Sequence, residues 1–234
     1  MRNEEKLNSS DSFFLKKFRF EIKKTPKLEE DFIAKSLKTG TTTVGLTCKD
    51  AVIFGTDKRA SMGYFVASKT SEKVYNIQDH LWMTTAGGVA DAQYLVDVLR
   101  AQTTIFQLEH DDKPIQIKSA GKMLSNILYS NKMFPFQVGL MLGGVTEEEG
   151  PTILNIGAYG SILNEKFCAV GSGQNFSYGV LEAKYKDNLS VEEGKEIIKK
   201  AVTSSIIRDM ASGNGIDIAV IKKEGPAERE FIPI

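Results

Sequence analysis

The sequence predicts an α+β fold of four layers, an α/β/β/α sandwich in which two antiparallel sheets pack face to face and a pair of helices covers each outer face. The expected elements run as several strands, two helices, several strands, two helices and a last strand. This order lacks the regular alternation of strand and helix that builds a doubly wound nucleotide-binding sheet. Two antiparallel sheets need their outer faces covered, and one helix pair for each is the economical packing.

The composition is that of one domain with an N-terminal extension. If residues 1–40 lie outside the core, the rest of the 234-residue chain still buries roughly 70% of its unfolded surface. Lys and Arg together number 30, as do Asp and Glu, so no basic field favours nucleic acid as a partner. The two cysteines, Cys48 and Cys168, lie in apolar runs, which predicts small buried side chains in a reducing compartment.

Neither a metal site nor a membrane segment is expected. The two histidines, His80 and His110, stand alone without ligand spacing, which argues against zinc. No apolar run approaches the ~18 residues of a membrane span. The first residues lack the apolar core of a signal peptide, and their acidic side chains argue against a transit peptide. We therefore expect a cytoplasmic protein.

Residues 1–40 are polar and charged and show no clean period, so we expect an extension that is weakly ordered on its own. Its few aromatic side chains favour docking on another surface. Among them are Phe13, Phe14, Phe18 and Phe20.

The first strands follow directly. Side chains alternate along residues 43–48, which predicts a half-buried strand, and Lys49-Asp50 is typical of a tight turn. Residues 51–57 read as the hairpin partner. That strand runs into the charge cluster at residues 57–61. A strand with a purely structural role would not require such a cluster.

Two strands and two helices come next. Residues 73–77 and 80–86 are expected as strands, the second ending at a Gly-Gly pair. The period then changes to three and four, which predicts an amphipathic helix from residue 89 to about 109. Pro114 is expected to open a second helix that runs to about residue 133, because proline favours the first helical position.

The second half repeats this order. Strands are expected over 137–145, 152–156 and 167–170, followed by a short helix over 177–185. A capping box, Ser190 with Glu193, then opens a helix to Asp209, since the two side chains satisfy free amides of the first turn. The last strands are expected at 216–221 and 231–232.

A hydroxyl nucleophile in this chain needs a base other than histidine. An N-terminal threonine can use its own α-amine, whose pKa near ~7.7–8.0 leaves a useful fraction of free base at neutral pH. A lysine side chain, with a pKa near ~10.4, would not. Thr41 lies at the start of the first strand, but it owns a free amine only if residues 1–40 are removed.

Six motifs in order carry a resemblance to a known family. They are Thr-Gly-Thr-Thr-Thr-Val-Gly from residue 39, Thr-Asp-Lys-Arg-Ala-Ser from 56, Ser-Glu-Lys-Val from 71, Thr-Ala-Gly from 85, Gly-Ser-Gly from 171 and Arg-Asp-Met-Ala-Ser-Gly-Asn-Gly from 208. Over residues 40–222 the chain resembles a proteasome β subunit, most of all the archaeal, catalytically active type. These are N-terminal-nucleophile hydrolases, a family whose fold is the four-layer sandwich.

The resemblance implies a role for each matching residue. Thr41 would be the nucleophile, freed by autolysis of the Gly40–Thr41 bond, so that residues 1–40 are a pro-segment and 41–234 the catalytic domain. Lys73 would lower the pKa of the Thr41 hydroxyl, Asp57 would pair with Lys73, and the Gly87 amide would form the oxyanion hole. Arg59 would brace the same network, and Ser172, Asp209 and Ser212 would complete the hydrogen-bonded surround of the Thr41 amine. No cofactor is needed.

The family correspondence also implies a substrate site. The backbone of Ser61 would pair with the substrate as an added strand. The residue before the cut would enter a pocket with Thr85 at its base, lined by Ala60, Ser71, Tyr75, Thr85, Val89 and Gln93. None of these six is charged, which predicts cleavage after apolar or neutral residues of limited size.

The implied partners are other β subunits in stacked heptameric rings, proteasome α subunits, a regulatory ATPase acting through the α ring, and unfolded polypeptide substrates. The forty-residue leader is longer than is usual in archaeal relatives. Two alternatives remain: a silent structural β subunit that retains its leader, and a small-molecule amidase of the same superfamily. The run from Ser212 to Gly215 disfavours the amidase.

Overall fold

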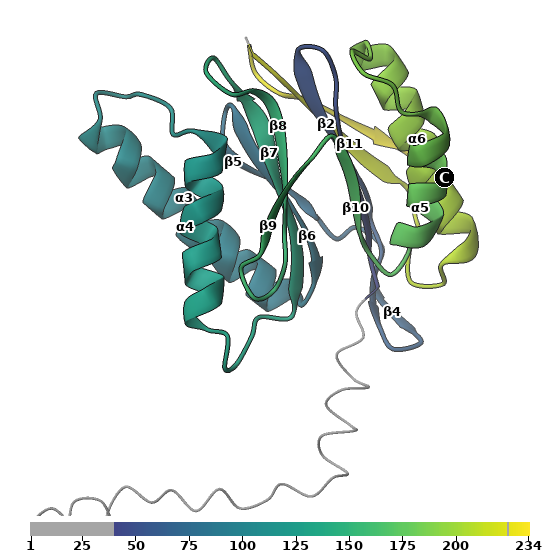
Figure 1. Cartoon of the computed structure of the whole chain (residues 1–234). Helices are drawn as coiled ribbons and strands as arrows, with labels where there is room; N and C mark the ends of the chain where they lie inside the picture. Colours follow the sequence, from purple (N-terminus) through teal and green to yellow (C-terminus); the bar gives the residue numbers. More distant parts are fainter. Residues whose placement is uncertain (1–39, 224) are drawn as a thin grey trace, which may run out of the picture. The chain divides into compact units, whose positions relative to one another are not determined.

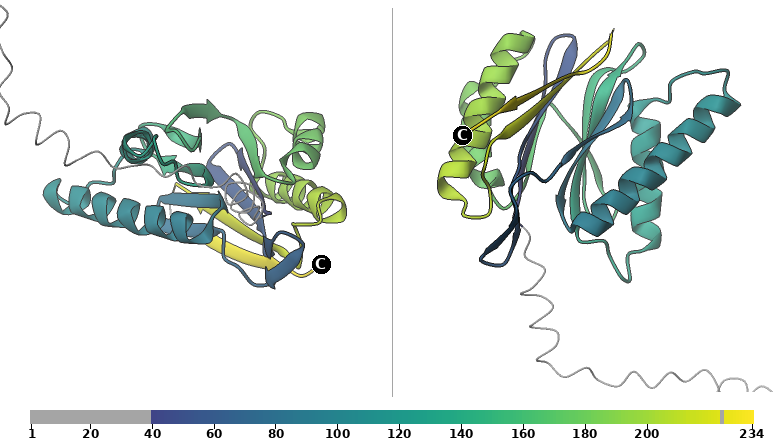
Figure 2. Two further views of the ribbon diagram at one scale, coloured as in Figure 1. Left: turned by 90° about the horizontal axis from the view of Figure 1, so that it is seen from below. Right: turned by 180° about the vertical axis from the view of Figure 1, so that it is seen from behind.

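The computed structural model describes residues 40–223 and 225–234. Apart from Gly40, the expected pro-segment therefore lies outside the described residues. The described chain forms the predicted four layers, with one helix pair on each side of two antiparallel sheets (Figure 1). The same order of layers is seen from behind (Figure 2).

The two sheets have five strands each. The first has the order β10 (Phe167–Gly171), β1 (Thr42–Thr47), β2 (Ala51–Asp57), β11 (Ile216–Lys222) and β12 (Glu228–Ile232). The second has the order β5 (Val74–Gln78), β6 (Leu81–Gly87), β7 (Val138–Thr146), β8 (Gly150–Ile156) and β9 (Ile162–Glu165). A small separate hairpin joins β3 (Ala60–Met62) to β4 (Phe65–Ser68).

The four helices of the described residues cover the outer faces. Helices α3 (Val89–Glu109) and α4 (Ile117–Ser130) pack on the second sheet, and helices α5 (Gln174–Lys184) and α6 (Val191–Arg208) pack on the first. Three apolar clusters result, one under each helix pair and one between the sheets. None of these helices is both long and apolar enough to cross a membrane.

The first hairpin forms as predicted, but its burial differs from the expectation. β1 pairs with β2, and the turn closes with the Cys48 amide donating to the Ala51 carbonyl at 2.7 Å. The strand is buried on both faces rather than half-buried, because the second sheet covers the face away from the helices. The Phe54 ring fills this space between the sheets, where a Cβ on Gly45 or on Gly143 would come within 2.8 Å of it.

Most predicted elements lie within one or two residues of their observed bounds, and two helix starts are corrected. The second helix begins at Ile117 rather than Pro114, because the Glu149 carboxylate accepts hydrogen bonds from the amides of Ile117 (2.7 Å) and Lys118 (3.3 Å). An anion from another part of the chain thus satisfies the free N–H groups of the first turn.

Helix α5 begins at Gln174, three residues earlier than expected, directly after the turn that holds Ser172. The capping box of α6 is confirmed: the Ser190 hydroxyl accepts from the Glu193 amide at 3.2 Å, and the Glu193 carboxylate accepts from the Ser190 amide at 3.0 Å. The sequence reading missed β3, β4 and β9, which are short strands of three or four residues.

Both cysteines are free and buried, as predicted. Burial raises the pKa of the Cys48 thiol to about 11 and that of the Cys168 thiol to about 12. Because the thiolate is the reactive form, we expect neither cysteine to react appreciably with Ellman's reagent at pH 8 in the folded chain, and both to react in guanidinium chloride. Rapid labelling of the native chain would contradict this packing.

Candidate active site

The expected nucleophile lies where three strand ends meet. β1 begins at Thr42, directly after Thr41, and lies between β10 and β2 in the first sheet. The antiparallel pairing sets Thr42 opposite Gly171 at the end of β10, and Thr43 opposite Thr56 near the end of β2. Residues far apart in the sequence are therefore brought around Thr41.

Thr41 is 4% exposed, and its hydroxyl lies against the peptide bond that precedes it. The Thr41 Oγ1 donates a hydrogen bond of 2.7 Å to the Gly40 carbonyl oxygen. The Gly40 amide in turn donates to the Ser61 Oγ at 3.0 Å. The hydroxyl is thereby held beside the carbonyl of the expected cleavage site.

Asp57 is fully buried and accepts four hydrogen bonds. Its Oδ1 accepts from the Thr42 amide (2.9 Å) and from the Lys73 Nζ (2.5 Å). Its Oδ2 accepts from the amides of Arg59 and Gly213, each at 3.0 Å. A carboxylate has about four lone-pair sites, so all its acceptor capacity is used.

Lys73 lines the same hollow as Thr41 and is 5% exposed. Its ammonium donates to Asp57 and to the Arg59 carbonyl oxygen, the latter at 2.6 Å. Burial lowers the pKa of Lys73 and outweighs the opposing effect of the Asp57 carboxylate. The cation is thus buried but paired, as a buried charge must be.

The hydroxyl groups of Ser172 and Ser212 connect residues 41 and 42 to the Asp209 carboxylate. The Thr41 amide donates to the Ser172 Oγ at 3.1 Å, and Ser172 donates to the Asp209 Oδ2 at 2.5 Å. Ser212 donates to the same Asp209 oxygen at 2.7 Å and lies 2.7 Å from the Thr42 hydroxyl. The three residues expected around the Thr41 nitrogen are therefore brought together, with Thr42 as an additional member.

Arg59 contributes to the network mainly through its backbone. Its guanidinium holds the loop after α6, since Nε donates to the Asn214 Oδ1 (3.0 Å) and Nη1 to the Met210 carbonyl oxygen (2.8 Å). The Arg59 carbonyl accepts a hydrogen bond from Lys73, and the Arg59 amide donates one to Asp57. Arg59 is a positioning residue in this geometry.

Two glycines with positive φ, Gly87 and Gly171, lie beside Thr41 in the folded chain. Gly87 has φ of +110°, and a Cβ there would lie 2.1 Å from the Gln137 carbonyl oxygen. Gly171 has φ of +109°, and a Cβ there would lie 2.0 Å from the Thr41 carbonyl oxygen. Only glycine fits at either position, because a side chain is both strained and obstructed.

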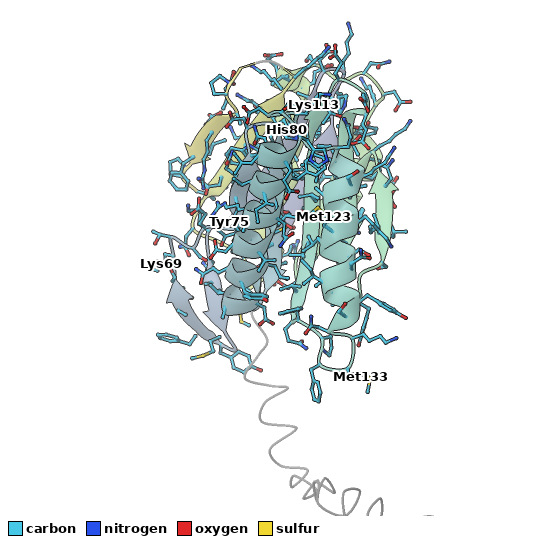
Figure 3. The ribbon with its side chains drawn as sticks, turned by 90° about the vertical axis from the view of Figure 1, so that its left-hand side faces the viewer. Lys69, Tyr75, His80, Lys113, Met123 and Met133 are labelled. Atoms are coloured by element: carbon cyan, nitrogen blue, oxygen red, sulfur yellow. The ribbon has the colours of Figure 1, made fainter. Side chains whose placement is uncertain are left out.

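A hollow lies beside Thr41 and contains five of the six residues expected for the substrate pocket. These are Ala60, Ser71, Tyr75, Thr85 and Val89, with Gly40, Gly87 and Ala92 also in the lining. Tyr75 lies beside helix α3, and Val89 is the first residue of that helix (Figure 3).

Gln93 is not among the lining residues. Helix α3 turns Ala92 toward the hollow and leaves Gln93 exposed, so the structure does not bring Gln93 together with the other five residues. The six expected residues carry no charge, but the lining also includes the charged residues Glu72 and Lys73.

The sequence reading gave no role to several residues that the structure places in the site. The Gly213 amide, the Asn214 side chain and the Thr42 hydroxyl all make the contacts described above. All three lie inside motifs that carried the resemblance, so a signal existed. Among the described residues, no group of three or more His, Cys, Asp or Glu could hold a metal ion.

The arrangement suits acyl transfer. A hydroxyl lies against a peptide carbonyl, next to a buried ammonium and a satisfied carboxylate, and the nitrogen of the same threonine faces a second hydroxyl–carboxylate group. Such a site matches the requirement for a nucleophile oriented by neighbouring groups.

Comparison with known proteins gives consistent matches. The family model described as proteasome subunit matches residues 37–221. A proteasome subunit beta of Methanocaldococcus vulcanius is 46% identical over 187 residues, which cover 80% of this chain and 83% of the relative. The corresponding protein of Methanocaldococcus fervens is 48% identical with the same coverage of both chains. A proteasome subunit beta 2 of Nitrosopumilus maritimus is 40% identical over 82% of this chain and 91% of the relative.

Proposed function

This chain belongs to the proteasome subunit family, and we propose that it is a proteolytic β subunit of the proteasome core that hydrolyses peptide bonds with Thr41 as its nucleophile. The observation that carries the proposal is the 2.7 Å hydrogen bond from the Thr41 hydroxyl to the Gly40 carbonyl, next to the Asp57–Lys73 pair. A silent subunit needs neither feature.

The described chain, with Gly40 still joined to Thr41, corresponds to the precursor. Thr41 Oγ1 attacks the Gly40 carbonyl carbon, the carbon–nitrogen bond breaks, and the nitrogen takes up a proton. The product is an ester between Gly40 and the Thr41 oxygen. Water then hydrolyses the ester, releases residues 1–40 and leaves Thr41 with a free amine and a restored hydroxyl.

The mature site repeats this chemistry on substrates. The Thr41 amine, beside Ser172 and Asp209, accepts the hydroxyl proton as Oγ1 attacks a substrate carbonyl. The Gly87 amide stabilises the oxyanion, and Lys73 lowers the pKa of the hydroxyl electrostatically. The peptide carbon–nitrogen bond then breaks, the Thr41 ammonium gives its proton to the leaving amine, and an ester to Thr41 Oγ1 remains. Water attacks this ester while the Thr41 amine accepts a proton from it, and the acid product leaves as the proton returns to Oγ1. Nothing in these steps requires a cofactor.

Assembly follows from the family. We propose heptameric β rings stacked on each other and capped by α-subunit rings, with unfolded polypeptide delivered by a regulatory ATPase in the cytoplasm. The alternative is a structural β subunit that retains its leader. The complete set of contacts around Asp57, Lys73 and Asp209 favours the active subunit. A small-molecule amidase is disfavoured by the same match to the family over most of the chain.

The test is N-terminal sequencing, with intact mass, of the chain after co-expression with α subunits. We expect the assembled protein to begin at Thr41 and to hydrolyse peptides but not small amides. An assembled and active particle whose β chain still begins at Met1 would exclude the proposed nucleophile, because its nitrogen would remain an amide. An assembled but inactive particle that retains the leader would establish the structural alternative.

A further inference from the structure

Glu72 is the acidic residue among those that line the hollow, next to Lys73, whose charge is paired with Asp57. It lines the hollow next to Ser71 and Tyr75, and the Tyr75 hydroxyl donates to the Glu72 carbonyl oxygen at 2.7 Å. A free carboxylate at this position would favour basic substrate side chains and repel acidic ones. The charge of Glu72 therefore matters for which residue enters the pocket.

The Glu72 carboxylate is paired with Arg229. The Arg229 Nη1 lies 2.6 Å from the Glu72 Oε1, and both side chains are partly exposed, at 39% and 48%. Arg229 comes from β12, close to the C-terminus, so that the last strand of the first sheet supplies a charge to the pocket wall.

A second carboxylate holds Arg229 in place. Its Nη2 lies 3.2 Å from the Asp217 Oδ2, and Asp217 is buried on β11. In the register of these strands Arg229 is opposite Ala219, two residues from Asp217, so the pair is a diagonal contact across the sheet. Lys58 binds the same Asp217 oxygen at 2.8 Å. The two cations Lys58 and Arg229 therefore balance the two carboxylates Asp217 and Glu72.

The other cations near this wall are engaged elsewhere. Lys73 donates to Asp57 and to the Arg59 carbonyl. Arg100 donates to the Asn76 carbonyl at 2.7 Å and pairs with Asp97 at 3.6 Å. Burial is the main cause that raises the pKa of Tyr75 and Glu72 raises it further, whereas the hydrogen bond with Thr85 and the charges of Arg100 and Arg229 lower it. Glu72 and Arg229 thus oppose each other at a side chain of the wall.

From this geometry we infer that Arg229 is a specificity-determining residue, which neutralises Glu72 and so keeps the pocket selective for uncharged residues before the cut. The inference rests on the proposed function, because it concerns the substrate of the same site. It predicts that loss of Arg229 shifts the preference toward basic residues before the cut, and that loss of Glu72 shifts it toward acidic ones.

The test uses the full chain co-expressed with α subunits and a set of peptides that differ only in leucine, arginine or glutamate before the cleaved bond. In Arg229→Met we expect the ratio of kcat/KM for the arginine peptide to that for the leucine peptide to rise about twofold to fivefold, the scale of one exposed charge pair. Hydrolysis after glutamate should fall. The double variant Arg229→Met with Glu72→Gln should return the ratio to that of the unchanged chain.

Two further variants make the test specific. Lys222→Met removes the same charge and an ion pair to Glu228 across the same two strands, away from the hollow, and should leave the ratio unchanged. Glu72→Gln leaves β12 intact and frees part of the Arg229 charge, so hydrolysis after glutamate should rise about twofold relative to leucine. This variant decides the question if Arg229→Met does not assemble.

The outcomes separate the inference from the function on which it rests. If the unchanged chain cleaves after leucine but Arg229→Met and Glu72→Gln both keep its ratios, Arg229 does not set specificity and the proposed function stands. A shift in Arg229→Met that persists in the double variant would also overturn the inference. If the unchanged chain cleaves no peptide, the proposed function fails and the inference fails with it.

Discussion

Thr41→Ala is expected to leave the chain at full length and to reduce peptide hydrolysis by roughly 10⁴-fold or more, the scale of losing a covalent nucleophile. The Thr41 hydroxyl is the group that lies 2.7 Å from the Gly40 carbonyl, so the variant lacks the atom that opens the leader bond. Without that cleavage no α-amine is released, and the base is lost together with the nucleophile. N-terminal sequencing and a fluorogenic peptide assay on the assembled particle measure both effects.

The fold should survive this change, because the Thr41 hydroxyl makes its one recorded hydrogen bond to the adjacent Gly40. Thr47→Ala is the matched control: it removes a threonine hydroxyl at the far end of β1, where the hydroxyl donates to the Lys166 carbonyl at 3.0 Å and lies 3.0 Å from the Tyr185 hydroxyl. That control should be processed and active. A processed, active Thr41→Ala particle would instead assign the nucleophile to another residue.

The sequence predicted the local structure well where a period or a cap decided it. The Ser190–Glu193 capping box and the hairpin from residue 43 to residue 57 depend on neighbours in the chain, and both form as expected. The first strand was nevertheless expected to be half-buried. Its second buried face depends on Phe54 packing between Gly45 and Gly143, and this contact exists only once the two sheets meet.

The residues of the site also divide into those that a sequence motif can identify and those that only the folded chain brings together. Thr41, Asp57 and Lys73 lie in motifs, so a resemblance identified them before any contact was known. The Glu72–Arg229 pair could not be found in this way, because it requires β12 to pair with β11 and bring a C-terminal residue beside residue 72. Likewise, helix α4 begins at Ile117 because a carboxylate 32 positions further on reaches its first amides, which Pro114 gave no means to anticipate.

Asp57→Ala is expected to abolish processing and activity and to destabilise the chain by about 3–5 kcal/mol, the cost of leaving one member of a buried ion pair without its partner. Four donors lose their acceptor: the amides of Thr42, Arg59 and Gly213, and the Lys73 ammonium. Lys73→Met is the informative comparison. It should also lose activity, but it leaves Asp57 with three amide donors and no buried cation, so its free energy of unfolding should fall less.

The two variants should also differ in their response to pH. Burial already lowers the pKa of Lys73, and Asp57 is the main group that opposes this, so Asp57→Ala should lower the Lys73 pKa further. Between that lowered pKa and the unfolded value of about 10.4, the unfolded chain binds more protons than the folded chain. The free energy of unfolding of Asp57→Ala should therefore rise as the pH increases through this window, and Lys73→Met should lack this contribution. Guanidinium unfolding of both variants at pH 7 and pH 9.5 measures the difference, and parallel pH curves would mean that Lys73 is not the buried cation that Asp57 compensates.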